Sequence, residues 1–289
     1  MPIISELFTY PIKSCAGIEL VRTRLVETGL EHDRNWMVTD AAGSMLTQRT
    51  YPRLALVRTA LDGNDLVVDA PGMPTLRTPL SATALEGAAT IRATVWRHTV
   101  DALDSGCETS HWFSDYLHSS ARLARFAPVV RREVSTKWTG GLKTHTRFAD
   151  RYPLLVLGQA SLDELNARLA SKGAPPVSID RFRPNIVVTG LDAHEEDYVE
   201  HVDIRATDGH FRLRLVKPCT RCSVPTIDQR TGTPNPAWPR EPLETMCTYR
   251  ANARFDGALT FGMNAVVVDG EGAALEVGQA IEMEIGFCV

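Results

Sequence analysis

The sequence predicts a mostly β protein with a few helices, of the α+β class, divided into two units. The N-terminal part alternates short β-type runs with turns, and the C-terminal part does so again. Two segments carry apolar residues at helical spacing. The length of 289 residues, 44% of them hydrophobic and 23% charged, suits a soluble globular chain with one large domain or two ordinary ones.

The first unit is predicted from four β-type runs separated by turns at 40–43 and 62–64. The runs are Ile3–Tyr10, Trp36–Thr39, Leu54–Leu61 and Leu66–Val68. Closely spaced strands of this kind are typical of a barrel or a sandwich. A helix over 109–117 closes the unit, because helical spacing relates Trp112, Phe113, Tyr116 and Leu117. We place the domain boundary between residues 124 and 125.

The second unit follows a basic, turn-containing stretch at 131–141. The apolar run Pro153–Leu157 leads into a helix, for which Ser161 and Glu164 form a capping box. Further strands are expected at Ile186–Val188 and where Phe211, Leu213 and Leu215 alternate with polar residues. We expect Ala265–Val268 to pair with Leu275–Ile285 as a hairpin across the turn 269–272. The helix should bury one face, formed by Leu162, Leu165 and Leu169.

Charge and targeting patterns disfavour several classes of function. The net charge is −4 and the isoelectric point about 6.1, and no long basic run is present, so we expect neither nucleic-acid nor membrane binding. The N-terminus lacks the pattern of a secretory signal, and no segment approaches the roughly 20 apolar residues of a membrane span. A cytoplasmic location is therefore expected. Free thiols or a metal ligand are expected from six scattered cysteines: Cys15, Cys107, Cys219, Cys222, Cys247 and Cys288.

The sharpest motif is Lys217-Pro218-Cys219-Thr220-Arg221-Cys222, directly after the alternating strand. A C-x-x-C pair can be a redox dithiol, half of a zinc site, or the source of one soft thiolate for another metal. Structural zinc is disfavoured because no second close cysteine pair exists. The thioredoxin type expects a helix to start at the motif, and residues 223–226 start a helix poorly. Two small buried residues at a strand end remain the plain structural alternative.

Three other short clusters place a cation or an amide beside a turn: residues 10–14, 33–36 and 183–185. Arginine and lysine are the usual phosphate partners, and asparagine can both donate to and accept from the edge of a heterocycle. A phosphorylated heterocycle is therefore conceivable as a ligand. Each cluster taken singly is better explained by a solvated surface charge or a turn residue.

Seven segments in order resemble the signature segments of the MOSC family: YPIKS, HDRNWMV, TQRTYPRL, FRPNIVVTG, KPCTRCSVPTID, REPLETMCTYR and FGMNAVVV. Within it they are similar to the two-part branch that includes the mitochondrial amidoxime reducing component and its bacterial counterparts. The resemblance implies an N-terminal MOSC_N β-barrel-like domain (1–124) and a C-terminal MOSC β-barrel domain (125–289). It also implies a molybdenum cofactor, rather than pyridoxal phosphate, held between them.

By the same resemblance, Cys222 is the molybdenum ligand and the catalytic residue, whereas Cys219 is structural or supporting. The other implied cofactor-binding residues are Lys13, Ser14, Arg34, Asp150, Arg183, Asn185, Thr220 and Asn264. The chain departs from the family pattern in the segment Asp150-Arg151-Tyr152-Pro153, where relatives often have small hydroxyl residues. It departs again at Met263, where a polar amide is common.

The implied activity is reduction of N-hydroxylated or N-oxygenated compounds such as amidoximes, hydroxylamines and N-hydroxylated bases. No G-x-G-x-x-G fingerprint and no four-cysteine cluster pattern is present, so electrons are expected from a separate ferredoxin-, flavin- or cytochrome-type protein. The alternative is a non-catalytic carrier of the cofactor or of sulfur. A third interpretation, thiol–disulfide exchange, needs both Cys219 and Cys222.

Overall fold

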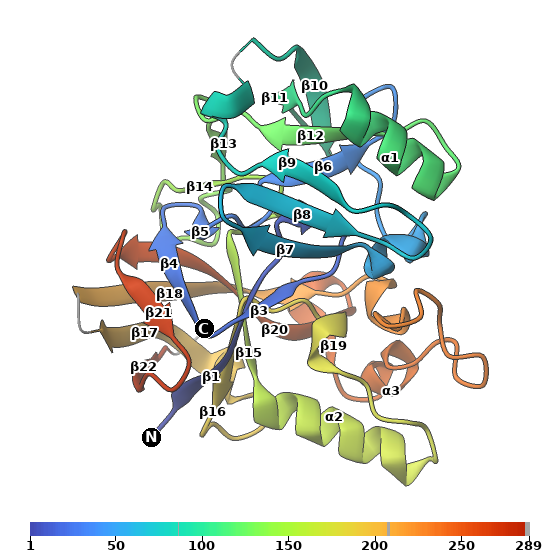
Figure 1. Ribbon diagram of the computed structural model, residues 1–289. Coiled ribbons are helices and arrows are strands. Elements are labelled where there is room, and N and C mark those ends of the chain that lie inside the picture. The colour runs from blue at the N-terminus through green and yellow to red at the C-terminus, as the bar shows by residue number, and fades with distance from the viewer. Residues whose placement is uncertain (86, 207–208, 287–289) are drawn as a thin grey trace.

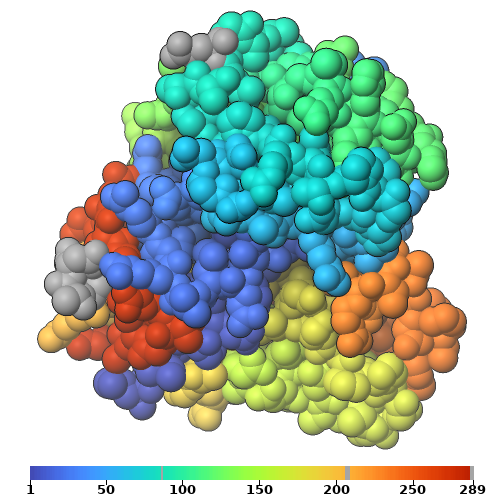
Figure 2. All heavy atoms as spheres, viewed as in Figure 1, coloured from blue at the N-terminus to red at the C-terminus, as the bar shows by residue number. Residues whose placement is uncertain are grey.

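The computed structural model describes residues 1–85, 87–206 and 209–286. The predicted class is confirmed, because the described chain is mostly β with three α-helices: α1 (Cys107–Leu117), α2 (Gln159–Ser171) and α3 (Leu243–Cys247). Two layered halves pack together, one around α1 and the other around α2 (Figure 1). In the space-filling view, N-terminal residues lie where the halves meet (Figure 2).

The half that contains α2 is built on a nine-stranded sheet of order β22-β17-β18-β20-β15-β16-β1-β3, with β19 paired to β20. Its strands are β1 (Ile3–Thr9), β3 (Ile18–Leu20), β15 (Leu154–Gly158), β16 (Ile186–Thr189), β17 (Val199–Ala206), β18 (Gly209–Thr220), β19 (Ala251–Asn252), β20 (Ala258–Asp269) and β22 (Ile281–Ile285). A small sheet of order β21-β4-β5 lies beside it, from β4 (Arg22–Val26), β5 (Gly29–Leu30) and β21 (Ala274–Glu276).

The other half holds a five-stranded sheet of order β10-β11-β12-β6-β2. Its strands are β2 (Ile12–Lys13), β6 (Trp36–Thr39), β10 (Thr90–Val95), β11 (His98–Asp104) and β12 (Arg122–Phe126). Two smaller sheets complete the described strands: β7 (Arg58–Asp62), β8 (Asp65–Asp69) and β9 (Leu76–Pro79), and the pair β13 (Arg132–Glu133) and β14 (His145–Thr146). As predicted, α1 buries its aromatic face, with Phe113 fully inaccessible to solvent.

The nine-stranded sheet curls around an apolar core, but no continuous ladder of hydrogen bonds joins its first and last strands. A single bridge between Ile3 and Ala280 links its two ends, and the Ile281 amide donates to the Pro2 carbonyl at 3.0 Å. Fully buried Ile4, Phe211 and Leu213 lie in the enclosed core. None of the sheets in the described residues closes into a barrel. The sequence led us to expect a barrel-like N-terminal domain and a barrel C-terminal domain, and the fold class holds although the sheets stay open.

Chain connectivity interleaves the two predicted units. Strand β1 pairs with β16 from Ile3↔Thr189 to Leu7↔Ile186, so the first residues complete the sheet of the second unit. Strand β12 spans the predicted boundary and pairs with β6. The boundary between residues 124 and 125 remains a prediction.

Two sequence predictions of strands are wrong. Residues 52–56 form a 3-10 helix with Pro52 in its first turn, where the fixed φ of proline suits a helix start, and strand β7 begins only at Arg58. The hairpin of 265–285 does not form either. Strand β20 pairs with β18 and β15, whereas β21 pairs with β4 and β22 with β17. Strands that are distant in sequence therefore occupy the strand edges that the two arms of a local hairpin would have shared.

The predicted capping box of α2 is also wrong. Ser161 is the third residue of the helix, which follows Gly158 without a side-chain cap. The Ser161 hydroxyl instead donates to the buried Glu196 carboxylate, at 2.7 and 2.8 Å from its two oxygens. The apolar face of α2 is confirmed, because Leu162, Leu165 and Leu169 are buried. Among the described residues, no helix combines the length and apolar character that crossing a membrane requires.

Candidate functional site

One cleft gathers all the residues that the sequence singled out for a site. Its walls include Lys13, Ser14, Arg34, Asp150, Arg183, Asn185, Thr220, Cys222 and Asn264. They come from both halves: Lys13 ends β2, Asp150 precedes β15, Thr220 ends β18, and Asn264 lies within β20. The structure therefore brings these positions together, and their roles remain predictions.

Three cleft residues have left-handed backbone conformations that side chains other than glycine rarely adopt. The φ angles are 69° at Ser14, 47° at Arg34 and 56° at Arg183. Such conformations cost free energy and persist only where the surrounding structure imposes them. Their concentration on the walls of one cleft marks it as a built site.

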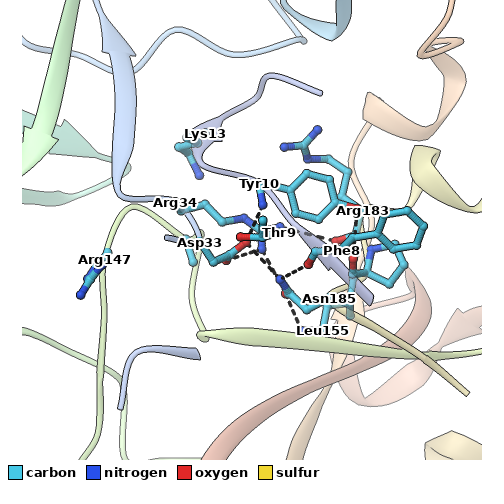
Figure 3. Close-up of polar contacts among 12 residues, drawn as sticks. Phe8, Thr9, Tyr10, Lys13, Asp33, Arg34, Arg147, Leu155, Arg183 and Asn185 are labelled. Atoms are coloured by element: carbon cyan, nitrogen blue, oxygen red, sulfur yellow. Dashed lines mark hydrogen bonds and ion pairs between the residues drawn. The ribbon is translucent and has the colours of Figure 1, made fainter. Parts of the chain in front are cut away.

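The side chain of Asn185 uses all of its hydrogen-bonding capacity within the protein (Figure 3). Its amide donates to the Phe8 carbonyl and to Asp33 Oδ1, both at 3.1 Å. Its oxygen accepts from the Leu155 amide at 3.2 Å and from Arg34 Nη1 at 3.0 Å. Asn185 therefore orients Arg34 and leaves no donor or acceptor of its own for a ligand.

Tyr10 organises the two arginines of the cleft. The guanidinium carbons of Arg34 and Arg183 lie 4.5 and 4.2 Å from the centre of its ring. The ring is buried, its hydroxyl donates to the Pro184 carbonyl at 3.0 Å, and burial raises the pKa of Tyr10. Arg34 also pairs with the buried Asp33 at 2.6 Å. Cation–π contact and ion pairing thus fix both arginines in place.

Arg183 has spare donor capacity. Its Nη1 donates to the Cys15 carbonyl at 2.7 Å, whereas its Nη2 is buried without a hydrogen-bond partner among the described residues. Burial lowers the pKa of the Arg183 guanidinium. A buried guanidinium N–H group without an acceptor costs free energy, and an anion in the cleft would satisfy it.

Lys13 and Asp150 form an ion pair across the cleft wall, and Trp96 Nε1 donates to the same Asp150 oxygen at 2.9 Å. Burial lowers the pKa of Lys13, and Asp150 counters this. Partial desolvation would raise the pKa of Asp150, but Lys13 and the Trp96 hydrogen bond bring it well below its usual range. The Arg132 guanidinium holds the adjoining loop by donating to the Asp150 carbonyl at 2.9 Å.

The thiols differ in accessibility. Cys222 is exposed on the cleft wall, Cys219 is half-buried, and Cys15 is buried, which raises the pKa of the Cys15 thiol to about 12. Arg221, between the two cysteines of the motif in sequence, donates from Nη1 to the Phe182 carbonyl at 2.8 Å. Cys288 lies outside the described residues. The described residues contain no group of three or more His, Cys, Asp or Glu side chains able to hold a metal.

Cations dominate the cleft, because the described residues that line it include seven Lys or Arg and one acidic residue. Four of these cations were not assigned from the sequence: Arg49, Arg151, Arg181 and Arg221. Buried Gln48 was also missed, and its amide donates to the Ser14 carbonyl at 2.8 Å. The segment TQRTYPRL, which contains Gln48 and Arg49, was the available signal. The cation excess predicts an anionic ligand.

Comparison with known proteins agrees with this architecture. Residues 1–120 match the MOSC N-terminal beta barrel domain and residues 143–282 match the MOSC domain, which defines a two-part MOSC protein. Mitochondrial amidoxime reducing component 2 of Rattus norvegicus is 34% identical over 256 residues, 86% of this chain and 72% of the relative. Mitochondrial amidoxime-reducing component 1 of Homo sapiens is 32% identical over the same shares. The chain therefore belongs to the MOSC family, in the branch of the amidoxime reducing components.

Two further similarities cover different extents. Molybdenum cofactor sulfurase of Bos taurus is 31% identical over 247 residues, which are 81% of this chain and 27% of that protein. The crystal structure of the YuaD protein from Bacillus subtilis aligns with a TM-score of 0.43 at 12% identity, covering 99% of this chain and 97% of that one.

Proposed function

We propose that this chain binds the molybdenum cofactor in the cleft and reduces N-hydroxylated or N-oxygenated compounds with electrons from a separate redox protein. The observation that carries the proposal is that two residues line the same cleft. They are Cys222, whose thiol is exposed, and Arg183, whose buried Nη2 has no hydrogen-bond partner among the described residues. Family membership with amidoxime reducing components supports the reaction class.

The residues present fit such a cofactor. A thiolate is a soft ligand suited to molybdenum, and Cys222 would be the protein's ligand. Arg183, Lys13 and Arg34, which line the cleft, would be the cations for the phosphate, while Ser14, Thr220 and Asn264 would offer polar groups to the pterin. When bound, the cofactor supplies two-electron redox chemistry.

The chain's own residues bind and orient the cofactor and the substrate. For an amidoxime, the N–O bond breaks, two electrons and two protons are consumed, and the oxygen leaves as water. The electrons come from the separate carrier of ferredoxin, flavin or cytochrome type. Asp33 and Asn185 keep Arg34 aimed into the cleft, and Lys13 Nζ holds a proton beside Asp150. Fixed charges of this kind cost no reorganisation during reaction.

The test uses purified, molybdenum-loaded protein with benzamidoxime as substrate. Reduced viologen, an artificial one-electron donor, should support formation of benzamidine, and NADH alone should give nothing. Cys222→Ala should abolish turnover, whereas Cys107→Ala, at an exposed cysteine outside the cleft, should not. Loaded protein that fails with every donor and every N-hydroxylated substrate would overturn the reductase.

A carrier of the cofactor or of sulfur is the second candidate. It is favoured by the similarity to a molybdenum cofactor sulfurase and by the exposure of the Cys222 thiol. A carrier should pass its cofactor, or sulfur, to an apo-enzyme without reducing amidoximes. Incubating the loaded chain with an apo-molybdoenzyme and measuring the activity recovered separates the two functions.

A further inference from the structure

Arg125 is a buried arginine outside the cleft that forms no ion pair within the described residues. It lies on β12 opposite Trp36 of β6, and only 7% of the residue is exposed. Its guanidinium carbon lies 4.3 Å from the centre of the Trp36 ring. Its Nε and Nη1 are buried without a hydrogen-bond partner in the described part of the chain, and so is Nε1 of the fully buried Trp36. Buried N–H groups of this kind are rare, because each costs free energy until an acceptor reaches it.

The turn that begins at His32 brings two further nitrogen-bearing side chains beside Arg125. His32 itself has a left-handed φ of 64° and is half-buried. Arg147 Nη1 donates to the side-chain oxygen of Asn35, and the Asn35 carbonyl accepts at 2.8 Å from the amide of Phe126, the residue after Arg125. Two guanidinium groups and an imidazole therefore gather around one turn, from three separate segments of the chain.

The charges of this group are not neutralised from within. Burial lowers the pKa of Arg125 to about 10 and Arg147 adds to the effect, which still leaves the guanidinium charged at neutral pH. Burial also lowers the pKa of His32, with Arg125 and Arg147 acting in the same direction and Glu31 opposing them. In the described residues no carboxylate pairs with either arginine, because Asp33 is occupied by its contacts on the cleft side and Glu31 stays beyond ion-pair distance.

We propose that Arg125, Arg147 and His32 bind a small tetrahedral oxyanion of the phosphate or sulfate type. Such an ion would supply acceptor oxygens to the unpartnered guanidinium of Arg125, and its charge of about −2 would balance the two arginines. Chloride or a single carboxylate has too little charge to balance both arginines. The inference goes beyond the proposed function and does not depend on it.

This site is separate from the cleft, although the two share a turn. The described residues that line the cleft include none of the three proposed ligands, and Arg147 lies on the opposite side of Asp33 from Arg183 (Figure 3). The Arg34 carbonyl accepts at 3.1 Å from the amide of the residue after Arg147. A bound oxyanion should therefore hold the turn from behind and raise the melting temperature of the folded chain.

The test compares the melting temperature of the full chain in phosphate and in chloride of equal ionic strength. Phosphate should raise the melting temperature of the wild type, because a ligand that binds only the folded state stabilises it. Arg125→Met keeps an unbranched side chain over Trp36 but removes the donors, and should weaken the apparent affinity for phosphate about tenfold or more. In chloride this variant should melt at the wild-type temperature or above it, since an uncompensated buried charge is gone.

Three further variants make the comparison specific. Phosphate can also enter the cationic cleft, so Arg183→Ala is measured in parallel and should keep the stabilisation that depends on Arg125. Arg122→Met removes an exposed arginine of the same strand, paired with Asp104, and should change nothing. Arg147→Met should weaken phosphate binding in the same direction as Arg125→Met, and it carries the same test should Arg125→Met fail to fold.

Crystals soaked in selenate, an analogue of sulfate that scatters anomalously, locate the ion. A selenate peak within hydrogen-bond distance of the Arg125 guanidinium, together with a phosphate effect that depends on Arg125, supports the site. Ordered water alone at Arg125, or equal stabilisation by phosphate in the wild type and in folded Arg125→Met, overturns it. A selenate peak without an effect in solution marks an adventitious ion only and overturns it as well.

Discussion

Asn185 donates from its side-chain amide to Asp33 Oδ1 at 3.1 Å, which joins a residue of the second predicted unit to one of the first beside the cleft. Asp33 accepts in addition from the Tyr10 amide at 2.9 Å and pairs with Arg34. Both side chains are almost completely buried. The stability of the fold and the orientation of the Arg34 side chain therefore both depend on Asn185 and Asp33.

Replacing Asn185 should destabilise the protein strongly. Asn185→Ala removes partners from the Asp33 carboxylate, the Phe8 carbonyl and the Leu155 amide, all in the interior. We expect a loss of about 3 kcal/mol in the free energy of unfolding, measured by urea denaturation. The control Asn252→Ala removes an exposed cap to the Arg254 amide and should cost about 1 kcal/mol or less. Equal losses would contradict the network.

The two cysteines of the C-x-x-C motif should behave differently. Cys222→Ala should purify without molybdenum, because its exposed thiol is the proposed ligand, whereas Cys219→Ala should retain most of the metal. Elemental analysis of the two purified variants is the measurement. Equal loss in both would instead indicate a dithiol site shared by Cys219 and Cys222.

Arg183 should dominate retention of the anionic part of the cofactor. Arg183→Ala should weaken retention about ten- to a hundredfold, since a charge-assisted hydrogen bond contributes roughly 1.5–3 kcal/mol. Lys13→Ala and Arg34→Ala should weaken it in the same direction. Cofactor content after dialysis is the readout, with Arg240→Ala, an exposed partner of Glu244, as the control. Unchanged retention in all three cleft variants would make these cations structural.

The buried Glu196 carboxylate should make stability fall as pH rises. Burial raises the pKa of Glu196 above its ordinary value, although Ser161 donates to it. Below the pKa of about 4.3 that a glutamate has in the unfolded chain, Glu196 is protonated in both the folded and the unfolded state, and its contribution to stability is fully present. Above it the unfolded state ionises first, so stability is lost until the folded pKa is passed.

Glu196→Gln removes that titration. The difference in unfolding free energy, variant minus wild type, should therefore increase from pH 4.5 to pH 7.5 in urea titrations. Glu271→Gln makes the same change at an exposed turn and is the control. A difference for Glu196→Gln that stays constant across this range would contradict the prediction.

Local pattern predicted most elements of the fold. Strand β6 has the predicted bounds, and α1 and α2 bury the faces that their periodicity indicated. Pairing partners were harder, because hydrogen bonds between strands do not depend on proximity in sequence. Leu275 pairs with Thr23 across almost the whole chain, and no local pattern indicates this. Ser161 illustrates the same limit, since a buried carboxylate from another element competes for its hydroxyl.

The motifs predicted the residues that line the candidate site, but they did not predict the hydrogen bonds and cation–π contacts that hold those residues in place. Cys222 and its companions stood in recognisable segments, and all of them line the cleft. Tyr10 and Asp33 stood in the same segments, yet their work of holding Arg34 and Arg183 depends on contacts that only folding creates. Trp96 lay outside every motif, at the tip of a hairpin whose approach to Asp150 is a property of how the halves pack.

The pairing of β1 with β16 limits how the gene can be divided. A fragment starting at residue 125 would present one edge of β16 without its neighbour, and an open edge of a buried strand recruits other chains. Such a fragment should aggregate, and a synthetic peptide of residues 1–20 added during refolding should rescue it in trans. A circular permutant that joins residue 289 to residue 1, by contrast, would keep β1 beside its partner wherever the new ends fall in an exposed loop.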